Sequence, residues 1–300
     1  MSAIDSAHPA WKAGNAPVAV VMIALNEAHN MEAVLENLAG WAQEVFLVDS
    51  YSSDTTVDIA LRHGVHVVQR RFRGFGDQWN FALKQLPINA PWTLKLDPDE
   101  RLTQALKDEI VARVQAAPHG GFQVPIRLFF LGRPLSHVLR LLRLWRTGTA
   151  TFSDVSANEH ARIAGSEGEL VAEIEHRDSP SLEHWFNKQN RYSSAEAQAR
   201  FEAQRLSDCP RLLGTALQRR MWLKRHFWKV PGRFVILFWY HLLVLGAWRA
   251  GRVGVLWARL RTQVFRMQED KFFEMQLYGR LPHATASGTG DPDGRVAQHD

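Results

Sequence analysis

Residues 18–25 read VAVVMIAL, a continuous apolar run that is rich in β-branched side chains. Such a run predicts a strand buried on both faces of a sheet. It stops at the polar pair Asn26 and Glu27, so we expect a loop directly after the strand. The rest of the fold can be worked out from this strand, because the segments that follow repeat its pattern.

Strand and helix patterns alternate as far as residue 96. Alternation of this kind predicts a parallel sheet covered by helices. Two later strand-like segments predict that the sheet becomes mixed, and beyond about residue 181 the pattern is helical to about residue 278. The expected strands after the first are 44–48, 65–69, 92–96, 121–130 and 137–145, and the expected helices are about 31–38, 55–63, 77–86 and 104–115.

Composition narrows the class of protein. The chain has 300 residues, 46% hydrophobic and 22% charged, which excludes a disordered, collagen-like or coiled-coil protein. The single cysteine, Cys209, excludes an internal disulfide framework and a cysteine-based zinc site, so a cytosolic compartment is the default. The first residues lack the pattern of a secretory signal, and no segment reaches the roughly 20 apolar residues of a spanning helix.

The basic charge is regional. Residues 200–280 hold 16 Lys and Arg against 5 Asp and Glu, although the net charge of the chain is only +5. Basic residues mixed with tryptophan suit an anionic membrane surface better than a solvated helix face, with nucleic acid as the competing partner. The tryptophans of this stretch are Trp222, Trp228, Trp239, Trp248 and Trp257.

Within this basic region lies the apolar run 234–248, FVILFWYHLLVLGAW. As one helix it would extend about 22 Å, which is too short for a hydrocarbon core of about 30 Å. Basic residues flank both ends, so we expect a helix that lies in the membrane interface without crossing it. The alternative is a core helix packed on the α/β domain.

Residues 96–100 read LDPDE and directly follow an expected strand. Ligands of open α/β sheets bind beyond the carboxyl ends of the strands. Asp97 and Asp99 can converge there on one hard cation, Mg²⁺ or Mn²⁺, which would neutralise phosphate oxygens. The alternative is that one of them simply caps the helix that begins near Thr103.

A second acidic segment, DSYSSDTT at residues 49–56, follows the second expected strand. A carboxylate at a strand end can accept hydrogen bonds from a nucleoside base or ribose, and we assign this role to Asp49. Asp54 is placed to cap the next helix, so its role is interpreted as mainly structural.

These motifs together resemble those of a known family. The Asn26–Glu27 pair, DSYSSDTT, GFGDQWNFAL at 74–83 and LDPDE are similar, in this order, to the nucleotide-sugar half of family-2 inverting glycosyltransferases with a GT-A fold. NEH at 158–160, IEH at 174–176 and KQNRYSSAEA at 188–197 resemble the bacterial branch that builds lipopolysaccharide core and related surface glycans. The resemblance covers about residues 17–275 and implies a Rossmann-like mixed sheet with helices on both faces.

The resemblance also implies a set of site residues. Asn26, Glu27 and Asp49 would line the nucleotide pocket, with Asp97 and Asp99 at the metal and diphosphate. Gln78 and Asn80 would lie near the nucleotide sugar. His176 joins the expected metal ligands, and His160 is a further candidate for phosphate or metal, although a lone histidine is more often a packed or surface residue.

Two departures from the family pattern change what it implies. The family usually has glycine where Tyr51 stands, so the loop after the second strand is expected to run differently. Lys188, Arg191 and Tyr192 replace the processive Q-x-x-R-W signature, which favours addition of a single sugar. Lys188 and Arg191 lie on one helix face and are placed to neutralise the diphosphate, or else form a solvated face.

Inverting transfer needs a base that takes a proton from the acceptor hydroxyl. Glu159 stands where the family places its catalytic carboxylate, and Asp154 is the nearest alternative. The plain alternative is that Glu159 is an exposed loop acid.

The sequence thus predicts an inverting glycosyltransferase that moves one sugar from a nucleotide donor, UDP-linked, to a lipid-linked or lipopolysaccharide-type glycan. We expect it on the inner face of the cytoplasmic membrane, bound to anionic lipid and not to nucleic acid. A nucleotidyltransferase would have a glycine- and lysine-rich loop where this chain has LNEAHN. A non-catalytic basic binding protein is the other alternative. The expected divisions are an extension at 1–16, the catalytic domain at 17–206, the basic helical region at 207–280 and a disordered tail at 281–300.

Overall fold

The centre of the fold is β1 (Ala16–Ala24), which pairs on both sides with parallel strands. The computed structural model describes residues 9–116, 119–153, 160–202, 211, 213–214, 218–219, 222–223 and 226–279. Side chains alternate along β1 between two apolar clusters, with Val20 and Met22 in one and Ala19 and Val21 in the other. The predicted strand with two buried faces is therefore confirmed.

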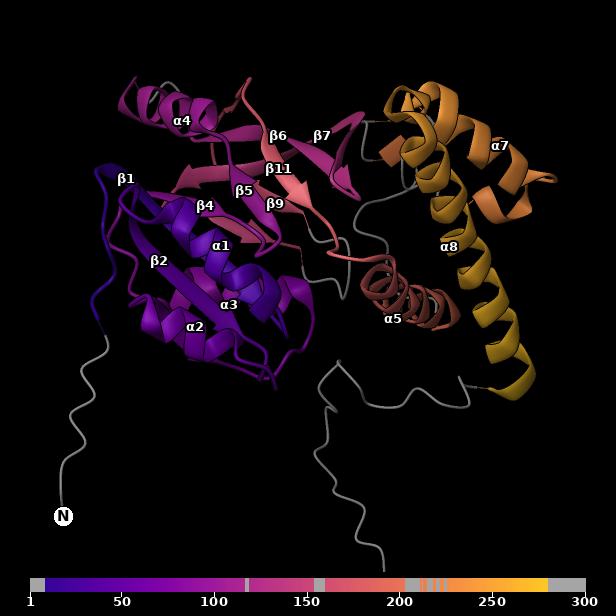
Figure 1. Ribbon diagram of the computed structural model, residues 1–300, viewed down its shortest axis with the longest axis horizontal. Helices are drawn as coiled ribbons and strands as arrows, with labels where there is room; N and C mark the ends of the chain where they lie inside the picture. The colour runs from indigo at the N-terminus through magenta and orange to yellow at the C-terminus, as the bar shows by residue number, and fades with distance from the viewer. Residues whose placement is uncertain are drawn as a thin grey trace, which may run out of the picture.

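The first half of the sheet is parallel. β1 pairs with β2 (Ala42–Asp49) and β4 (Trp92–Lys95), and β2 pairs with β3 (His66–Gln69). The connecting helices are α1 (Ala28–Leu38), α2 (Thr56–Arg62) and α3 (Phe75–Gln85). Figure 1 shows these helices around the indigo and purple part of the sheet.

The second half of the sheet is mixed, as the sequence predicts. β7 (Arg133–Arg146) runs antiparallel to both β4 and β6 (Gly121–Phe130). β11 (Ile174–Arg177) is parallel to β6 and antiparallel to β5 (Glu100–Leu102), and β10 (Glu167–Glu169) also pairs with β6. The helix α4 (Gln104–Ala116) follows β5, and β8 (Ala150–Phe152) and β9 (Ala161–Ile163) form a separate two-stranded sheet. The order of the main path is β3-β2-β1-β4-β7-β6-β11-β5.

The strand order fixes where a ligand can bind. From β1 the chain steps outward to β2 and β3, then returns to the other side of β1 to form β4. The carboxyl ends of β1 and β4 therefore flank a topological switch point, where open α/β sheets hold their ligands. The loops at this edge contain the Asn26–Glu27 pair and LDPDE.

The C-terminal helices form an arm beside the sheet (Figure 1). α5 (Leu182–Phe201) packs against the long α8 (Gly251–Tyr278), and a third apolar cluster joins them to the end of β6 through Phe130, Trp185 and Trp257. Between them lie η1 (Phe227–Lys229), α7 (Arg233–Trp239), a π-helical turn η2 (Tyr240–Val244) and η3 (Ala247–Ala250).

The expectation of one continuous helix over 234–248 is wrong. α7 passes into η2, and Gly246 then adopts a left-handed φ of 71°, which ends the helical path before η3 begins. Among the described residues, no single helix is long and apolar enough to cross a bilayer. The pair 233–244 and 247–278 meets that criterion only when taken together, and it is bent by 66°.

Candidate active site

The loop after β2 is organised by a buried carboxylate. Asp49 is fully buried, and it accepts hydrogen bonds from the Ser52 amide at 2.9 Å, the Ser52 hydroxyl and the Gln69 amide group at 3.0 Å. Asp49 therefore shapes the loop at the carboxyl end of β2. Its predicted contact with a nucleotide base or ribose stays a prediction.

The loops after β1 and β2 are bonded to each other. The Asn26 amide donates to Ser52 Oγ at 2.8 Å, and the Ser53 amide donates to Asn26 Oδ1 at 2.8 Å. Asp54 accepts from the amide of Thr56, the first residue of α2, at 3.0 Å, as its predicted capping role requires. It also accepts from the amide of Ala28, the first residue of α1, at 3.1 Å. One aspartate thus holds the beginnings of two helices.

Glu27 lies in the loop after β1, within the electrostatic influence of Asp99 in the acidic turn after β4. Its backbone amide donates to Thr56 Oγ1 at 2.8 Å, and its carboxylate accepts from Asn30 Nδ2 at 2.8 Å. Burial, and then the nearby charge of Asp99, raise the pKa of Glu27 to about 7. The two strand ends therefore meet at the switch point, as the topology requires.

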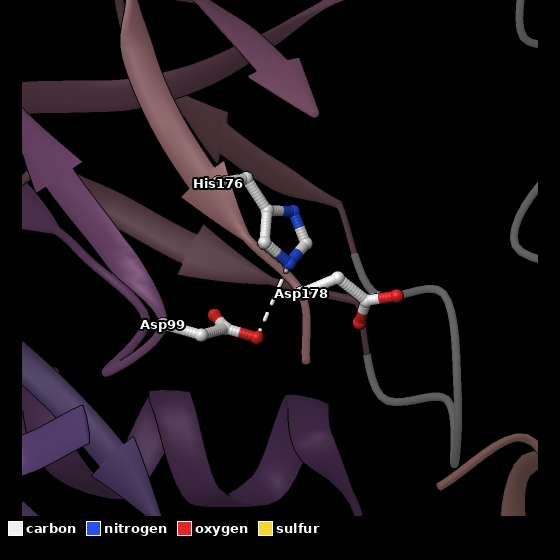
Figure 2. Close-up of side chains that lie close together, drawn as sticks. All are labelled: Asp99, His176 and Asp178. Carbon is white, nitrogen blue, oxygen red and sulfur yellow. Dashed lines mark hydrogen bonds and ion pairs between the residues drawn. The ribbon is translucent and has the colours of Figure 1, made fainter. Parts of the chain in front are cut away.

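Three side chains form a group that could hold a divalent cation: Asp99, His176 and Asp178 (Figure 2). Asp99 lies in the turn before β5, and the pairing of β5 with β11 places His176 opposite Glu100. His176 Nε2 lies 3.2 Å from Asp99 Oδ2, and one ligand atom from each of the three residues lies within 4.8 Å of the others. Burial alone would lower the pKa of His176, but the Asp99 carboxylate raises it to about 9.

Lys188 of α5 bridges the two carboxylates of this group. Its Nζ lies 2.9 Å from Asp99 Oδ2 and 2.9 Å from Asp178 Oδ1. Burial opposes ionisation of Asp99, but His176 and Lys188 hold the pKa of Asp99 well below its usual range. Both carboxylates also hold the pKa of Lys188 above its usual range against the effect of burial. The predicted contact of Lys188 with a diphosphate stays a prediction.

Asp97 belongs to a neighbouring cluster and not to this group. Arg143 Nη2 of β7 lies 3.1 Å from Asp97 Oδ2 and 2.9 Å from Glu100 Oε1, and the Asp97 amide donates to Glu100 Oε2 at 2.9 Å. Burial would raise the pKa of Asp97, but Arg143 holds it below its usual range. The predicted metal ligands were Asp97, Asp99 and His176. The structure instead joins Asp178 to the latter two, so metal binding by Asp97 stays a prediction without a place in the group.

The alternative role of LDPDE as a helix cap is taken by another residue. Thr103 Oγ1 accepts from the Leu106 amide at 3.2 Å in the first turn of α4. Asp97 and Asp99 have the partners described above. Sequence reasoning missed Asp178, Glu100 and Arg143. The available signal for Asp178 was its position two residues after His176 at a strand end.

Gln78 and Asn80 lie on α3. Gln78 is fully buried, accepts from Arg70 Nη1 at 2.8 Å and donates to Ser50 Oγ at 3.3 Å, which holds α3 to the loop after β2. Asn80 exchanges two hydrogen bonds with the backbone of Phe152, at 3.0 and 2.9 Å, and so fastens α3 to β8. Their predicted positions near the nucleotide sugar stay predictions.

The remaining predicted residues divide into two sets. Asp154 and Glu159 lie outside the described residues, and His160 is the first described residue after them. Arg191 and Tyr192 lie on α5 with exposed side chains, whereas Lys188 on the same helix is mostly covered. Tyr51 has a left-handed φ of 62°, the conformation that a glycine would adopt most easily. The expected difference in the path of this loop from that of the family stays a prediction.

The position of Lys188 between two buried carboxylates predicts a large effect on stability. Lys188→Met removes the cation between two buried carboxylates, so the free energy of unfolding should fall by about 3 kcal/mol or more. Arg191→Met on the same helix is the matched control, and it should change the free energy by less than about 0.5 kcal/mol. Urea denaturation in the presence of a chelator measures both, since a bound cation cannot then replace the lysine charge. Equal stability of the two variants would contradict the ion-pair assignment.

Comparisons with known proteins agree with this geometry. Residues 19–162 match the family described as Glycosyl transferase family 2. An uncharacterised glycosyltransferase of Rickettsia typhi is 26% identical over 196 residues, which cover 60% of this chain and 66%, just under two thirds, of the relative. The lipopolysaccharide core biosynthesis glycosyltransferase LpsC of Rhizobium meliloti is 28% identical over 201 residues, covering 62% and 73% of the two chains.

A solved structure supports the fold. The mannosyltransferase PcManGT of Pyrobaculum calidifontis, solved with GDP-Man and Mn²⁺, has a TM-score of 0.50 at 16% identity, with 88% of this chain and 90% of that chain covered. At this identity the likeness concerns the fold alone, which is the mixed α/β sheet predicted from the sequence. Residues 19–162, just under half of the chain, therefore match a glycosyltransferase family 2 domain.

Proposed function

We propose that the chain transfers a single sugar, with inversion, from a nucleotide-sugar donor to a lipid-linked or lipopolysaccharide-type glycan. The observation that carries this proposal is the Asp99–His176–Asp178 group at the switch point of the sheet, with Asp99 inside the residues that match family 2. A diphosphate leaving group needs a concentrated positive charge beside it, and a divalent cation supplies that charge. The name of the LpsC relative supports the choice of acceptor class.

The ligand atoms of the group favour Mn²⁺ over Mg²⁺. Two carboxylate oxygens suit either ion, but the imidazole nitrogen of His176 suits a transition metal better than Mg²⁺, which prefers oxygen ligands in octahedral geometry. Asp99, His176 and Asp178 would hold the cation. Lys188 is within reach of two of these ligands, so it would remain beside the diphosphate as a second positive charge.

For the donor we propose UDP as the nucleotide, with Asn26, Glu27, Asp49, Gln78, Asn80, Asp97, Lys188 and Arg191 as binding residues. The loops after β1 and β2 support the set of binding residues, since their mutual hydrogen bonds hold Asn26 and the loop after Asp49 together. A thermal-shift comparison of UDP-, GDP- and TDP-sugars with Mn²⁺ tests the base, because a ligand that binds the native state raises its apparent stability.

For the general base we propose Glu159, with Asp154 as the alternative. The support is the sequence motif and the position of the segment that contains both residues. This segment follows β8, which Asn80 fastens to α3, and it precedes β9. A carboxylate there would accept the proton of the acceptor hydroxyl while the nucleotide diphosphate leaves from the opposite side of the sugar.

We also propose that the arm attaches the protein to the inner face of the cytoplasmic membrane. Leu242 and Ala247 pack into the third cluster, as the core alternative requires, but α7 itself contains no buried residue. α7 and the turns η2 and η3 after it expose large apolar side chains, and Arg233, Arg249 and Arg252 lie in or next to the same stretch of sequence. The exposed side chains are Val235, Ile236, Trp239, Tyr240, Leu243, Val244 and Trp248. Exposed apolar and aromatic groups with arginines nearby in the sequence match an anionic lipid interface.

The cation group predicts the effect of one isosteric change. Asp99→Asn should abolish the Mn²⁺-dependent part of UDP binding, because it removes the charge of a ligand while keeping its shape. Titration calorimetry of UDP with and without Mn²⁺ measures this effect, and Asp58→Asn on the exposed face of α2 is the control. Full transferase activity in excess chelator, or undiminished transfer by Asp99→Asn, would refute the assignment.

The two candidate bases are separated by their kinetics. Glu159→Gln should keep the affinity for UDP but lower turnover by roughly 10²-fold or more, the usual contribution of an acid or base. Asp154→Asn is measured beside it in the same assay. If Asp154→Asn is inactive while Glu159→Gln turns over normally, the two roles are reversed.

The membrane surface can be tested without truncating the chain. The double variant Ile236→Glu and Val244→Glu should reduce co-sedimentation with phosphatidylglycerol vesicles by at least about tenfold, since it replaces two exposed apolar side chains by charges. Val171→Glu, at a comparably exposed valine away from the arm, should bind vesicles like the wild type. Wild-type protein that ignores these vesicles at low salt would refute the membrane proposal.

A further inference from the structure

Tyr51 has a backbone conformation that is unfavourable for its residue type. Its φ is 62°, in the left-handed region where the Cβ atom crowds the backbone. Glycine adopts this conformation without that cost, and asparagine adopts it more readily than tyrosine. A tyrosine here therefore lowers the stability of the folded chain unless its side chain gains something in return.

The surrounding loop imposes this conformation from both sides. Before Tyr51, the Ser50 amide donates to the Ala24 carbonyl at 2.8 Å. After it, the Ser52 amide donates to Asp49 Oδ2 at 2.9 Å, and Ser52 Oγ accepts from the amide of Asn26, which is itself left-handed with a φ of 58°. The strained residue is thus held between fixed points, as such residues usually are at functional sites.

The side chain gains little inside the protein. Tyr51 is 57% exposed. Among the described residues, its ring lies outside the three apolar clusters and stacks on no other aromatic ring. The cost of its backbone conformation is therefore not offset by burial. The residue is best explained by a contact with a molecule that binds at this edge.

The position of Tyr51 indicates which part of a donor it would meet. It lies two residues after Asp49, at the carboxyl end of β2, one strand away from the switch point where the cation group lies. A diphosphate at that group would place its nucleoside toward β2 and β3, since these strands continue the same edge. An exposed aromatic ring at the carboxyl end of β2 suits the flat face of a base.

We propose that the ring of Tyr51 stacks on the base of the nucleotide donor and is a donor-binding residue retained at the expense of stability. This inference rests on the proposed function, because it requires a nucleotide at the cation group. It adds to that proposal a stacking contact on the base, made by a side chain that is not among the proposed binding residues.

The test compares two probes that differ by the nucleoside. UDP with Mn²⁺ contains base, ribose and diphosphate, whereas inorganic pyrophosphate with Mn²⁺ contains only the diphosphate. Tyr51→Gly and Tyr51→Asn both remove the ring, and the asparagine variant controls for the added flexibility of glycine. Tyr51→Phe keeps the ring and removes only the hydroxyl.

Calorimetric titration should show a selective loss. Both ring-deleting variants should bind UDP about fivefold to a hundredfold more weakly, the range that stacking of one base spans. They should bind pyrophosphate like the wild type, and Tyr51→Phe should bind both probes like the wild type. The melting temperature of Tyr51→Gly should be at or above that of the wild type, because the left-handed strain is relieved.

Each other result overturns the inference in a recognisable way. Unchanged UDP affinity in the glycine and asparagine variants would refute the stacking contact while leaving the proposed donor intact. An equal loss for UDP and pyrophosphate would assign Tyr51 to the phosphates. A loss in the glycine variant alone would reduce its role to loop rigidity. Wild-type protein that binds neither probe would overturn the proposed function together with this inference.

Discussion

Burial of negative charge in a short turn is the constraint that organises this molecule. Asp97, Asp99 and Glu100 lie within four consecutive residues, and both Asp99 and Glu100 are almost completely shielded from solvent. Carboxylates so placed repel one another and lose their hydration, so the turn is stable only if cations are brought to it. Those cations come from three distant elements: Arg143 from β7, His176 from β11 and Lys188 from α5. β7, β11 and α5 of the second half of the chain thus each place one basic side chain beside the acidic turn.

The charge of the acidic turn also acts on the loop after β1. The turn follows β4, beside the carboxyl end of β1, so its charge also reaches Glu27 and raises the pKa of that carboxyl. A cation or a diphosphate complex that binds at this edge would change the local charge, where the acidic and basic side chains already neutralise one another. The charge at this edge is therefore set by several side chains together and not by any single one.

The sequence was sufficient for the parts of the fold that depend on local pattern. The run 18–25 identifies β1 because burial on both faces requires continuous apolar character, and LDPDE marks its turn because polar residues follow a buried strand. The positions of Asp178 and Arg143 beside Asp99 and Asp97 could not be predicted from local pattern. They depend on the pairing of β11 with β5 and of β7 with β4. The break after η2 was missed for a different reason. A single glycine inside an apolar run does not reveal whether its φ will be positive, and Gly246 decides the path of the chain there.

The packing of α5 against α8 connects the arm to the acidic turn. α5 carries Lys188. Further along α5, the Asn190 carbonyl and Ser193 Oγ accept hydrogen bonds from Lys271 of α8, at 2.7 Å and 2.8 Å. α8 also continues directly from the segment that contains the exposed apolar face. α5 thus carries both the ammonium group that bridges Asp99 and Asp178 and the groups that α8 contacts. The position of α8 and the position of the Lys188 charge are therefore set by contacts along one and the same helix.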